Sequence, residues 1–421
     1  MRRPRARATA SAAALLLAVA LGGCGSTDLL GHGAHRRSSA TATTVATVGH
    51  SVAAGGGDVG RQTAAQLGFP DLATKNTTRV PGADAVSDAA AVALAVDPST
   101  APGTHPQAVT LAPTDDWQAA LAAASLMGAP FRAPMLLSPA SGLPVATANA
   151  LGLLAPAGAP SLGGTQAVLV GDVPAPPHLR SVRISGGSPY AIAANIDAYE
   201  AARRGRESID VVVASAQTPA DAMPAAGWAA ESGEPLLYVN AAGVPAVTAA
   251  ALRRHRHPHI YVLGPASAIP DAVLSTLAHY GTVRRISGAT APAESVAFAE
   301  YRDPACVYGQ PCAHVPRSFG WAIRSPGHGY VFLNAHNPLS AAAAAALSAS
   351  GSFGPQLLLS NARTLPSPVL NYLLDFATPG YSSEGPTAAV YNHAWLIGNL
   401  GAVSASVQAQ IDSILEVVPA K

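Results

Sequence analysis

Three arginines recur at one position of a repeated pattern, each lying three residues before a glycine. They are Arg79, Arg183 and Arg285, and the last two stand in identical Arg-Ile-Ser-Gly segments. A guanidinium group binds carboxylate or phosphate through paired N–H donors, so three such groups could bind an anionic polymer as a set. The same recurrence fits a structural salt bridge between repeat units, for instance to Asp221. The residues alone leave both interpretations open.

The densest cationic run is Arg-Arg-His-Arg-His-Pro-His, residues 253–259. It favours a helix C-terminus, where Arg and His complement the partial negative charge of the last carbonyls. Contact with an anionic polymer is the second interpretation. A metal site built from His255, His257 and His259 is the third, and it is disfavoured because the three residues straddle a helix end and Pro258.

Motifs for catalysis are sparse. The sequence contains no Gly-x-Ser-x-Gly elbow, no His-Glu-x-x-His pair and no Gly-x-x-x-x-Gly-Lys loop. Gly171, Gly264 and Gly398 follow apolar runs, but none begins a Gly-x-Gly-x-x-Gly fingerprint, so tight turns explain them. We therefore predict no catalytic residue, no cofactor and no metal ion.

The N-terminus has the organisation of an export signal. Four arginines within the first seven residues precede the apolar run Ala12–Leu21, which is too short to span a bilayer. Leu21-Gly-Gly-Cys24 follows and resembles the lipobox of bacterial lipoproteins. The resemblance implies cleavage before Cys24, its lipidation, and a cell-membrane anchor facing the wall or the extracellular side. A plain secretory signal with an incidental cysteine is the alternative, and the sequence leaves Sec or Tat export open.

Cleavage of this signal changes the charge balance. It removes four of the 25 basic residues and none of the 24 acidic ones, which leaves a net charge of −3. A chain without an overall basic field is not expected to bind nucleic acid. The start of the mature chain is rich in Ser, Thr, Gly and His, which is typical of a flexible tether.

Two cysteines are left once Cys24 carries lipid. Cys306 and Cys312 lie close together in a loop-like stretch, and the exported location is oxidising, so a local disulfide is predicted. A metal-binding pair is the alternative, but the second pair of ligands that a structural zinc site needs is missing.

The rest of the chain alternates short apolar segments with stretches of helical periodicity. In the middle copy, strands are predicted over 209–215, 235–239, 259–264 and 283–287, and helices over 221–231, 245–255, 270–280 and 291–301. Fully apolar strands between helices indicate a parallel sheet that is covered on both faces.

This pattern occurs three times. Val109–Ala112 parallels Val211–Ala214 at an offset of 102, and Pro134–Leu137 parallels Pro235–Tyr238 at an offset of 101. A weaker third copy places segments 330–334, 355–359 and 394–398 in the same order. Several anchors in one order at a consistent offset favour internal repeats over one large α/β domain.

The segments of each copy have a recognisable order. Arg-φ-x-Gly comes first, then an apolar strand, a helix near Pro-Ala-Asp221-Ala, Pro-φ-Leu-Leu, and three apolar residues before Gly. This order is similar to the cell wall-binding repeat type 2 family, over roughly residues 76–418. The resemblance implies an α/β protein of three tandem Rossmann-like parallel-sheet modules, packed as an internal pseudo-trimer within a monomer. It also implies non-covalent binding of an anionic cell-wall glycopolymer, to which Arg79, Arg183, Arg285 and Asp221 would contribute.

The likeness covers the scaffold better than the binding residues. The family continues its Arg-x-Gly segment with Asp-Arg-Tyr, which all three copies lack. The Asp of Pro-Asp-Ala is replaced by Gln118 in the first copy and by Ser340 in the third.

We divide the chain accordingly. Residues 1–23 are the signal peptide and 24–75 the lipidated cysteine with its tether; the modules are 76–181, 182–283 and 284–421. The third module contains an insertion over 303–328 that carries both remaining cysteines, Phe319 and Trp321. We interpret it as a tolerated surface insertion, with a specificity loop as the alternative.

The predicted function is non-catalytic binding of wall polymer by a lipid-anchored envelope protein. An envelope hydrolase with an unrecognised site is one alternative. A structural or solute-binding lipoprotein, whose repeats have lost their affinity for polymer, is the other.

Overall fold

The computed structural model describes residues 72–101, 103–303, 319–350, 353–377, 380–381 and 390–419. Cys24, Cys306 and Cys312, with nearly all of the predicted signal peptide and tether, lie outside these ranges. Among the described helices, none is both long and apolar enough to cross a membrane.

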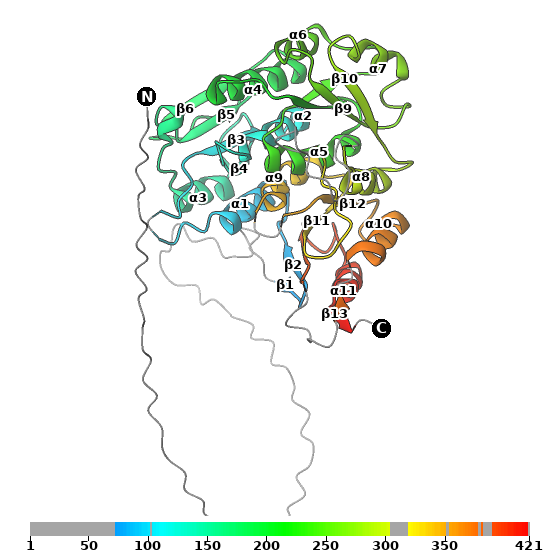
Figure 1. Cartoon of the computed structure of the whole chain (residues 1–421). Helices are drawn as coiled ribbons and strands as arrows, with labels where there is room; N and C mark the ends of the chain where they lie inside the picture. Colours follow the sequence, from blue (N-terminus) through cyan, green and yellow to red (C-terminus); the bar gives the residue numbers. More distant parts are fainter. Residues whose placement is uncertain are drawn as a thin grey trace, which may run out of the picture. The chain divides into compact units, whose positions relative to one another are not determined.

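Three parallel sheets share one strand order (Figure 1). The first sheet runs β4 (Met135–Ser138), β3 (Val109–Pro113), β5 (Ala167–Val170), β6 (Ser181–Ile184). The second runs β8 (Leu236–Val239), β7 (Asp210–Ser215), β9 (His259–Leu263), β10 (Thr282–Ile286). The third runs β12 (Gln356–Leu359), β11 (Gly329–Asn334), β14 (His393–Ile397), β2 (Thr77–Val80), with β1 (Leu72–Ala73) antiparallel at its edge. Apart from these, β13 (Gly380–Tyr381) pairs with β15 (Val418–Pro419).

The fourth strand of each sheet is the one that carries a recurring arginine. Arg183 lies opposite Leu169 on β5, Arg285 opposite Val262 on β9, and Arg79 opposite Leu396 on β14. The third sheet thus takes its last strand from the beginning of the described chain.

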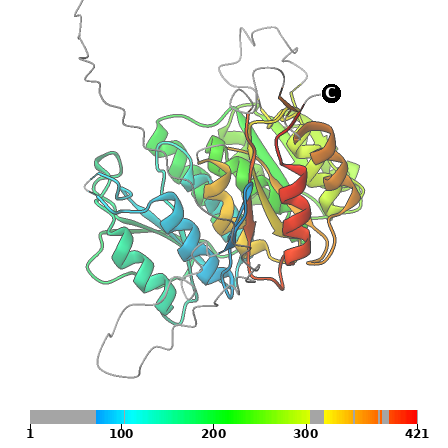
Figure 2. The same cartoon turned by 90° about the horizontal axis from the view of Figure 1, so that it is seen from below.

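The helix that follows each of these strands packs on the next sheet. Helix α4 (Pro189–Arg204) covers β8 and contacts α6 (Ala246–Arg254), and α8 (Ala291–Glu300) covers β12 and contacts α10 (Ser367–Tyr372). Likewise, α1 (Ala85–Val96) covers β4 and contacts α3 (Val145–Leu154). Each strand–helix pair therefore links two modules, and β2 with α1 closes the ring between the third and the first (Figure 2).

Three central helices contact one another where the modules meet. They are α2 (Trp117–Ala122), which continues into the 3-10 turn η1 (Ala123–Met127), α5 (Pro219–Ser232) and α9 (Pro338–Ser348). The facing surfaces are mostly alanine, as in the buried run Ala341–Ala346. Small side chains let the helices approach closely, and the predicted pseudo-trimer of three Rossmann-like modules is confirmed.

The other helices lie towards the outside of the modules. They are α7 (Asp271–Leu277), α11 (Ala405–Ile414), the 3-10 turn η2 (Pro160–Leu162) and the π-helical turn η3 (Leu373–Ala377). The linking helices begin at side-chain caps: Asp84, Ser188 and Thr290 each accept a hydrogen bond from a backbone N–H of the first turn. Such caps satisfy donors that a helix start leaves unpaired.

The prediction of a surface insertion over residues 303–328 is wrong at Phe319, Trp321 and Ile323, which are buried. Phe319 is buried and stacks on Tyr261 with ring centroids 3.5 Å apart, and Trp321 meets Trp228 of α5 at 5.3 Å. Aromatic side chains bury large apolar areas, so Phe319 and Trp321 belong to the core, whereas Arg324, Ser325 and Gly327 are exposed. Residues 304–318 lie outside the described ranges.

Backbones of the first two modules meet at a pair of glycines. A Cβ built on Gly128, after η1, would lie 2.6 Å from the Cα of Gly233, which caps α5. Gly152, inside α3, has nothing within 4 Å of its own Cβ position. The two positions make a matched pair for testing the module contact.

We expect Gly128→Ala to destabilise the fold by about 1–3 kcal/mol, because backbone atoms must move apart. Gly152→Ala should instead stabilise it by about 0.5–1 kcal/mol, since Ala is the better helix former. Thermal and urea unfolding of both variants measures the difference. Equal effects of the two changes would contradict the close contact between modules.

Candidate functional site

A cavity lies at the carboxyl ends of the third sheet's strands. In open α/β sheets, ligands bind at this edge. Loops after β11, β14 and β2 line a volume of about 570 Å³ together with Thr114, Asp115 and Trp117 of the first module. Asp84, Asp88 and Asp115 line it, with Trp117 and His336 beside them.

An equivalent but smaller cleft lies at the same edge of the first sheet. It encloses about 330 Å³ and is lined by the loops after β3, β5 and β6. Asp115 lines both clefts. The repeated strand order thus produces repeated clefts, each formed where one module meets another.

These walls suit a hydroxyl-rich ligand. Carboxylate oxygens and the amides of Asn334 and Asn337 accept or donate hydrogen bonds, and the Trp117 ring offers an apolar face. The ring is held edge-on against Tyr238 of the second module, at 6.1 Å between centroids. Tyr238 also donates a 2.8 Å hydrogen bond to the carbonyl of Gln118.

The recurring arginines donate to backbone carbonyls at the end of the neighbouring strand. Arg79 Nη1 lies 2.9 Å from the carbonyl oxygen of Gly398, Arg285 Nη1 lies 2.7 Å from that of Gly264, and Arg183 donates to Gly171. The three glycines have φ values of +94°, +124° and +68°. Each guanidinium therefore holds the turn that follows the third strand of its sheet.

The three arginines differ in how far their side chains are exposed to solvent. Arg79 is 1% exposed and also donates to Gln408 Oε1 from Nε and Nη2, at 3.1 and 2.9 Å. Arg183 is exposed, and Arg285 is partly exposed and pairs with Asp271 at 3.1 Å. A structural role thus accounts for the recurrence, with backbone carbonyls in place of Asp221. Polymer binding by the set stays a prediction.

The glycine of each Arg-x-x-Gly segment lies against the following helix. A Cβ on Gly82 would lie 2.2 Å from Asp88 Oδ1, one on Gly186 would lie 2.8 Å from the N of Ile192, and one on Gly288 would lie 2.2 Å from the N of Glu294. A side chain at these positions would push the linking helix off the sheet.

Two buried acids, Asp88 and Glu294, lie on the linking helices where two modules meet. They were not identified from the sequence. Asp88 is 2% exposed, and its Oδ2 accepts a 3.0 Å hydrogen bond from Ser340 of α9. Burial raises the pKa of Asp88 to about 7. Both acids lie nine residues after an arginine, so the repeat offset could have revealed them.

Glu294 takes the equivalent place between the second and third modules. It is 1% exposed, and no side chain within the described ranges donates a hydrogen bond to its carboxylate. Burial, and then the charge of Asp221, raise the pKa of Glu294 to about 9. Asp221 is half-buried at the start of α5, and burial raises its pKa too. Its polymer contact stays a prediction.

A comparison with known protein families finds a match in the middle module. Residues 183–274 match the family model described as Cell wall binding domain 2 (CWB2). The match begins at the strand of Arg183 and runs through β7, β8 and β9. None of the curated proteins compared with the sequence matches it.

Two solved structures share the fold of all three modules. "Cwp8 from Clostridium difficile" has a TM-score of 0.59 and 16% identity over 81% of this chain and 52% of that one. "Cwp6 from Clostridium difficile" has a TM-score of 0.62 and 14% identity over 81% of this chain and 48% of that one. The chain thus spans about half the length of either structure.

We expect Arg79→Gln to cost about 2–4 kcal/mol of stability, because it leaves buried carbonyls without their charged donor. Arg183→Gln is the matched change at an exposed position, where water can replace the donor, and should cost under about 1 kcal/mol. Urea unfolding of both variants tests the ranking. A smaller loss for Arg79→Gln than for Arg183→Gln would refute the structural role.

The raised pKa of Glu294 predicts a pH-dependent stability. The folded state holds this proton up to about pH 9, whereas an unfolded Glu releases it near pH 4, so stability should fall as pH rises between these values. Glu294→Gln should therefore raise the melting temperature more at pH 9 than at pH 5. Glu300→Gln, at the end of the same helix, is the control. An equal gain at both pH values would contradict the burial of a protonated Glu294.

Proposed function

We propose that this chain is a non-catalytic cell-envelope protein that binds an anionic cell-wall glycopolymer non-covalently through its three repeat modules. The observation that carries the proposal is the match of residues 183–274 to Cell wall binding domain 2, inside a ring of three modules with one strand order. Lipid on Cys24 would hold the protein at the membrane as a monomer facing the wall.

Repetition of the clefts supports a repetitive ligand. Weak contacts that are linked on one rigid body give avidity beyond any single site, provided that the ligand reaches them together. A glycopolymer meets this condition because its units repeat along the chain. The clefts at the first and third sheets would each take part of it.

The carboxylates of the clefts restrict what part of the polymer they can take. Asp84 and Asp115 line the larger cleft beside amides and an indole ring. Such walls favour sugar hydroxyls over phosphate or carboxylate groups, since like charges repel at short range. We therefore assign the sugar rings of the polymer to the clefts and its anionic groups to cations elsewhere on the surface.

A solute-binding lipoprotein is the second candidate. The cavity of about 570 Å³ falls within the range of small-molecule sites, roughly 300–1,000 Å³. A free sugar that binds without any affinity for intact wall would favour this candidate.

Retention by purified cell wall tests the proposal. The full-length protein should co-sediment with wall and should lose most of this binding after the anionic polymers are extracted. Asp115→Asn, which changes both clefts, should weaken binding by roughly threefold to tenfold through a lost hydrogen bond. Asp375→Asn, at an exposed position outside both clefts, should not. Absence of wall binding by the unaltered protein would reject the proposed function.

A further inference from the structure

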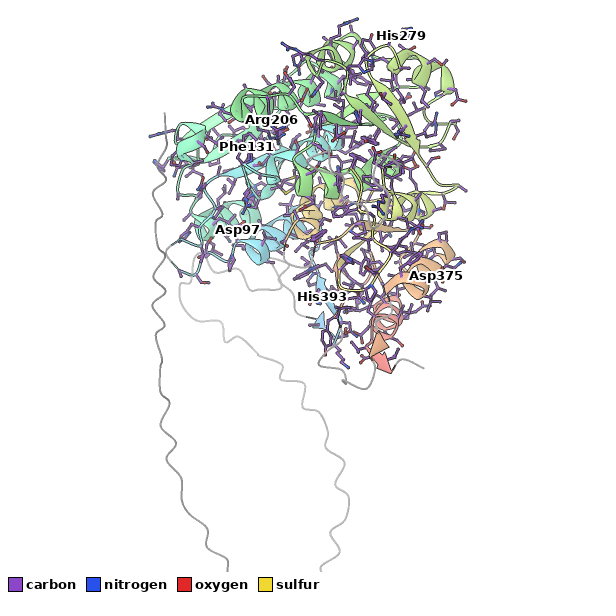
Figure 3. The ribbon with its side chains drawn as sticks, viewed as in Figure 1. Asp97, Phe131, Arg206, His279, Asp375 and His393 are labelled. Atoms are coloured by element: carbon purple, nitrogen blue, oxygen red, sulfur yellow. The ribbon has the colours of Figure 1, made fainter. Side chains whose placement is uncertain are left out.

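A basic surface, opposite in charge to the acidic clefts, lies at the C-terminal ends of α4 and α6. The two helix ends form a groove of about 910 Å³ on the second module. Arg206, Arg253, Arg254 and Arg256 line it, and Glu207 is the acid among its lining residues. Figure 3 labels Arg206, which follows the end of α4. The fold thus brings the cationic run 253–259 beside arginines some fifty residues earlier in the chain.

The helix dipole explains only part of this cluster. Arg203 and Arg204 stand in the last turn of α4, and Arg253 and Arg254 in that of α6, where they complement the carbonyl ends. Arg206 and Arg256 lie beyond the helix ends. The dipole effect is confined to the last turn and does not account for the positions of these two charges.

The arginines also differ in their partners. Arg254 is committed to Asp197 at 2.8 Å and lies 3.7 Å from Glu207. Arg253 stacks on Tyr280, with the guanidinium 5.1 Å from the ring centroid, and is otherwise exposed. For Arg206 and Arg256, both exposed, the described part of the chain supplies no side-chain partner.

The turn that carries Arg256 adopts a strained backbone. Arg256 and His257 have φ values of +53° and +75°, in the left-handed region that favours glycine. The equivalent turn after α3 is also left-handed, at Ala155 with φ +41°, so two modules share this conformation and only the second places an arginine there. Strain of this kind persists where the surroundings enforce it, and it gathers at binding sites.

Hydrogen bonds of the buried His255 hold this turn in place. Its Nε2 lies 3.0 Å from Asp197 Oδ2, and its Nδ1 lies 2.8 Å from the carbonyl oxygen of Ser208. Burial alone would lower the pKa of His255, but the hydrogen bond to Asp197 and the nearby carboxylates outweigh it and raise the pKa.

The arrangement around His255 argues against a metal ion. Asp197, Glu207 and His255 lie close enough to hold one. However, both imidazole nitrogens face acceptors, and Arg254 occupies the carboxylates. The cluster is therefore an internal ion network that fixes the turn.

We infer that this basic groove binds the anionic groups of the wall glycopolymer, with Arg206, Arg253 and Arg256 as its contact residues. The inference rests on the proposed function for its partner, and it assigns the phosphate or carboxylate groups that the acidic clefts cannot take. Guanidinium groups bind such oxyanions in pairs.

A combined variant R206Q/R253Q/R256Q tests the groove directly. The probes are soluble poly(glycerol phosphate) and polygalacturonate, titrated at low and high ionic strength against the full-length protein. We expect the unaltered protein to bind at least one probe, more weakly as salt rises, and the variant to lose roughly tenfold in affinity. The two probes distinguish phosphate from carboxylate as the preferred group.

A matched control removes three exposed arginines elsewhere, in R132Q/R180Q/R363Q, with the same change in net charge. Equal losses in both variants, or no binding of either probe by the unaltered protein, would overturn the inference. So would binding to phosphatidylglycerol vesicles with none to the polymers, since a lipid surface would then be the partner. Wall retention of the unaltered protein, measured alongside, tests the proposed function separately. Retention with normal salt dependence in the groove variant would reject the groove alone.

Discussion

Thr77–Val80 of β2 pair with Ala394–Ile397 of β14, across more than three hundred residues of chain. Without β2, the strand β14 would be a sheet edge with unpaired backbone N–H and C=O groups. In each sheet the fourth strand, β6, β10 or β2, is followed by the helix that covers the neighbouring sheet. The first sheet and its covering helix α1 lie within residues 85–184, and the second sheet and α4 lie within 189–286, whereas the third sheet must take β2 from the start of the described chain. The ring of three depends on this exchange, and β2 is the strand that closes it.

One residue pattern serves this exchange three times. The arginine holds the turn after the adjacent strand through a glycine carbonyl, and the glycine three residues later lets the linking helix approach. The residue nine positions after the arginine lies on this linking helix, at the junction between the two modules. Where that residue is Asp88 or Glu294, the junction buries an acid, and this burial raises its pKa. Packing between modules thus determines the chemistry at their boundaries.

Charge is separated over the surface in a way that net charge does not reveal. Carboxylates gather at the strand ends of the third and first sheets, and arginines gather at the helix ends of the second. A polymer of sugars joined by anionic groups presents both chemistries at regular intervals. Binding the two kinds of group at separate places would avoid repulsion between the polymer and the acidic clefts. It would also make affinity depend on the spacing of the polymer's charges.

The alternation of apolar strands with helices, and its threefold repetition, are properties that the sequence determines by itself. Local periodicity decides which segments become strands and helices, and the constant offset shows that the copies are equivalent. The recurrence of Arg79, Arg183 and Arg285 was also visible, but their partners were not, because backbone carbonyls leave no mark in a sequence. Tertiary structure alone decided that β2 joins the third sheet, that Asp88 meets Ser340, and that Arg206 lies near Arg256. These contacts join residues that are distant along the chain, and their geometry follows from burial and packing rather than from local preference.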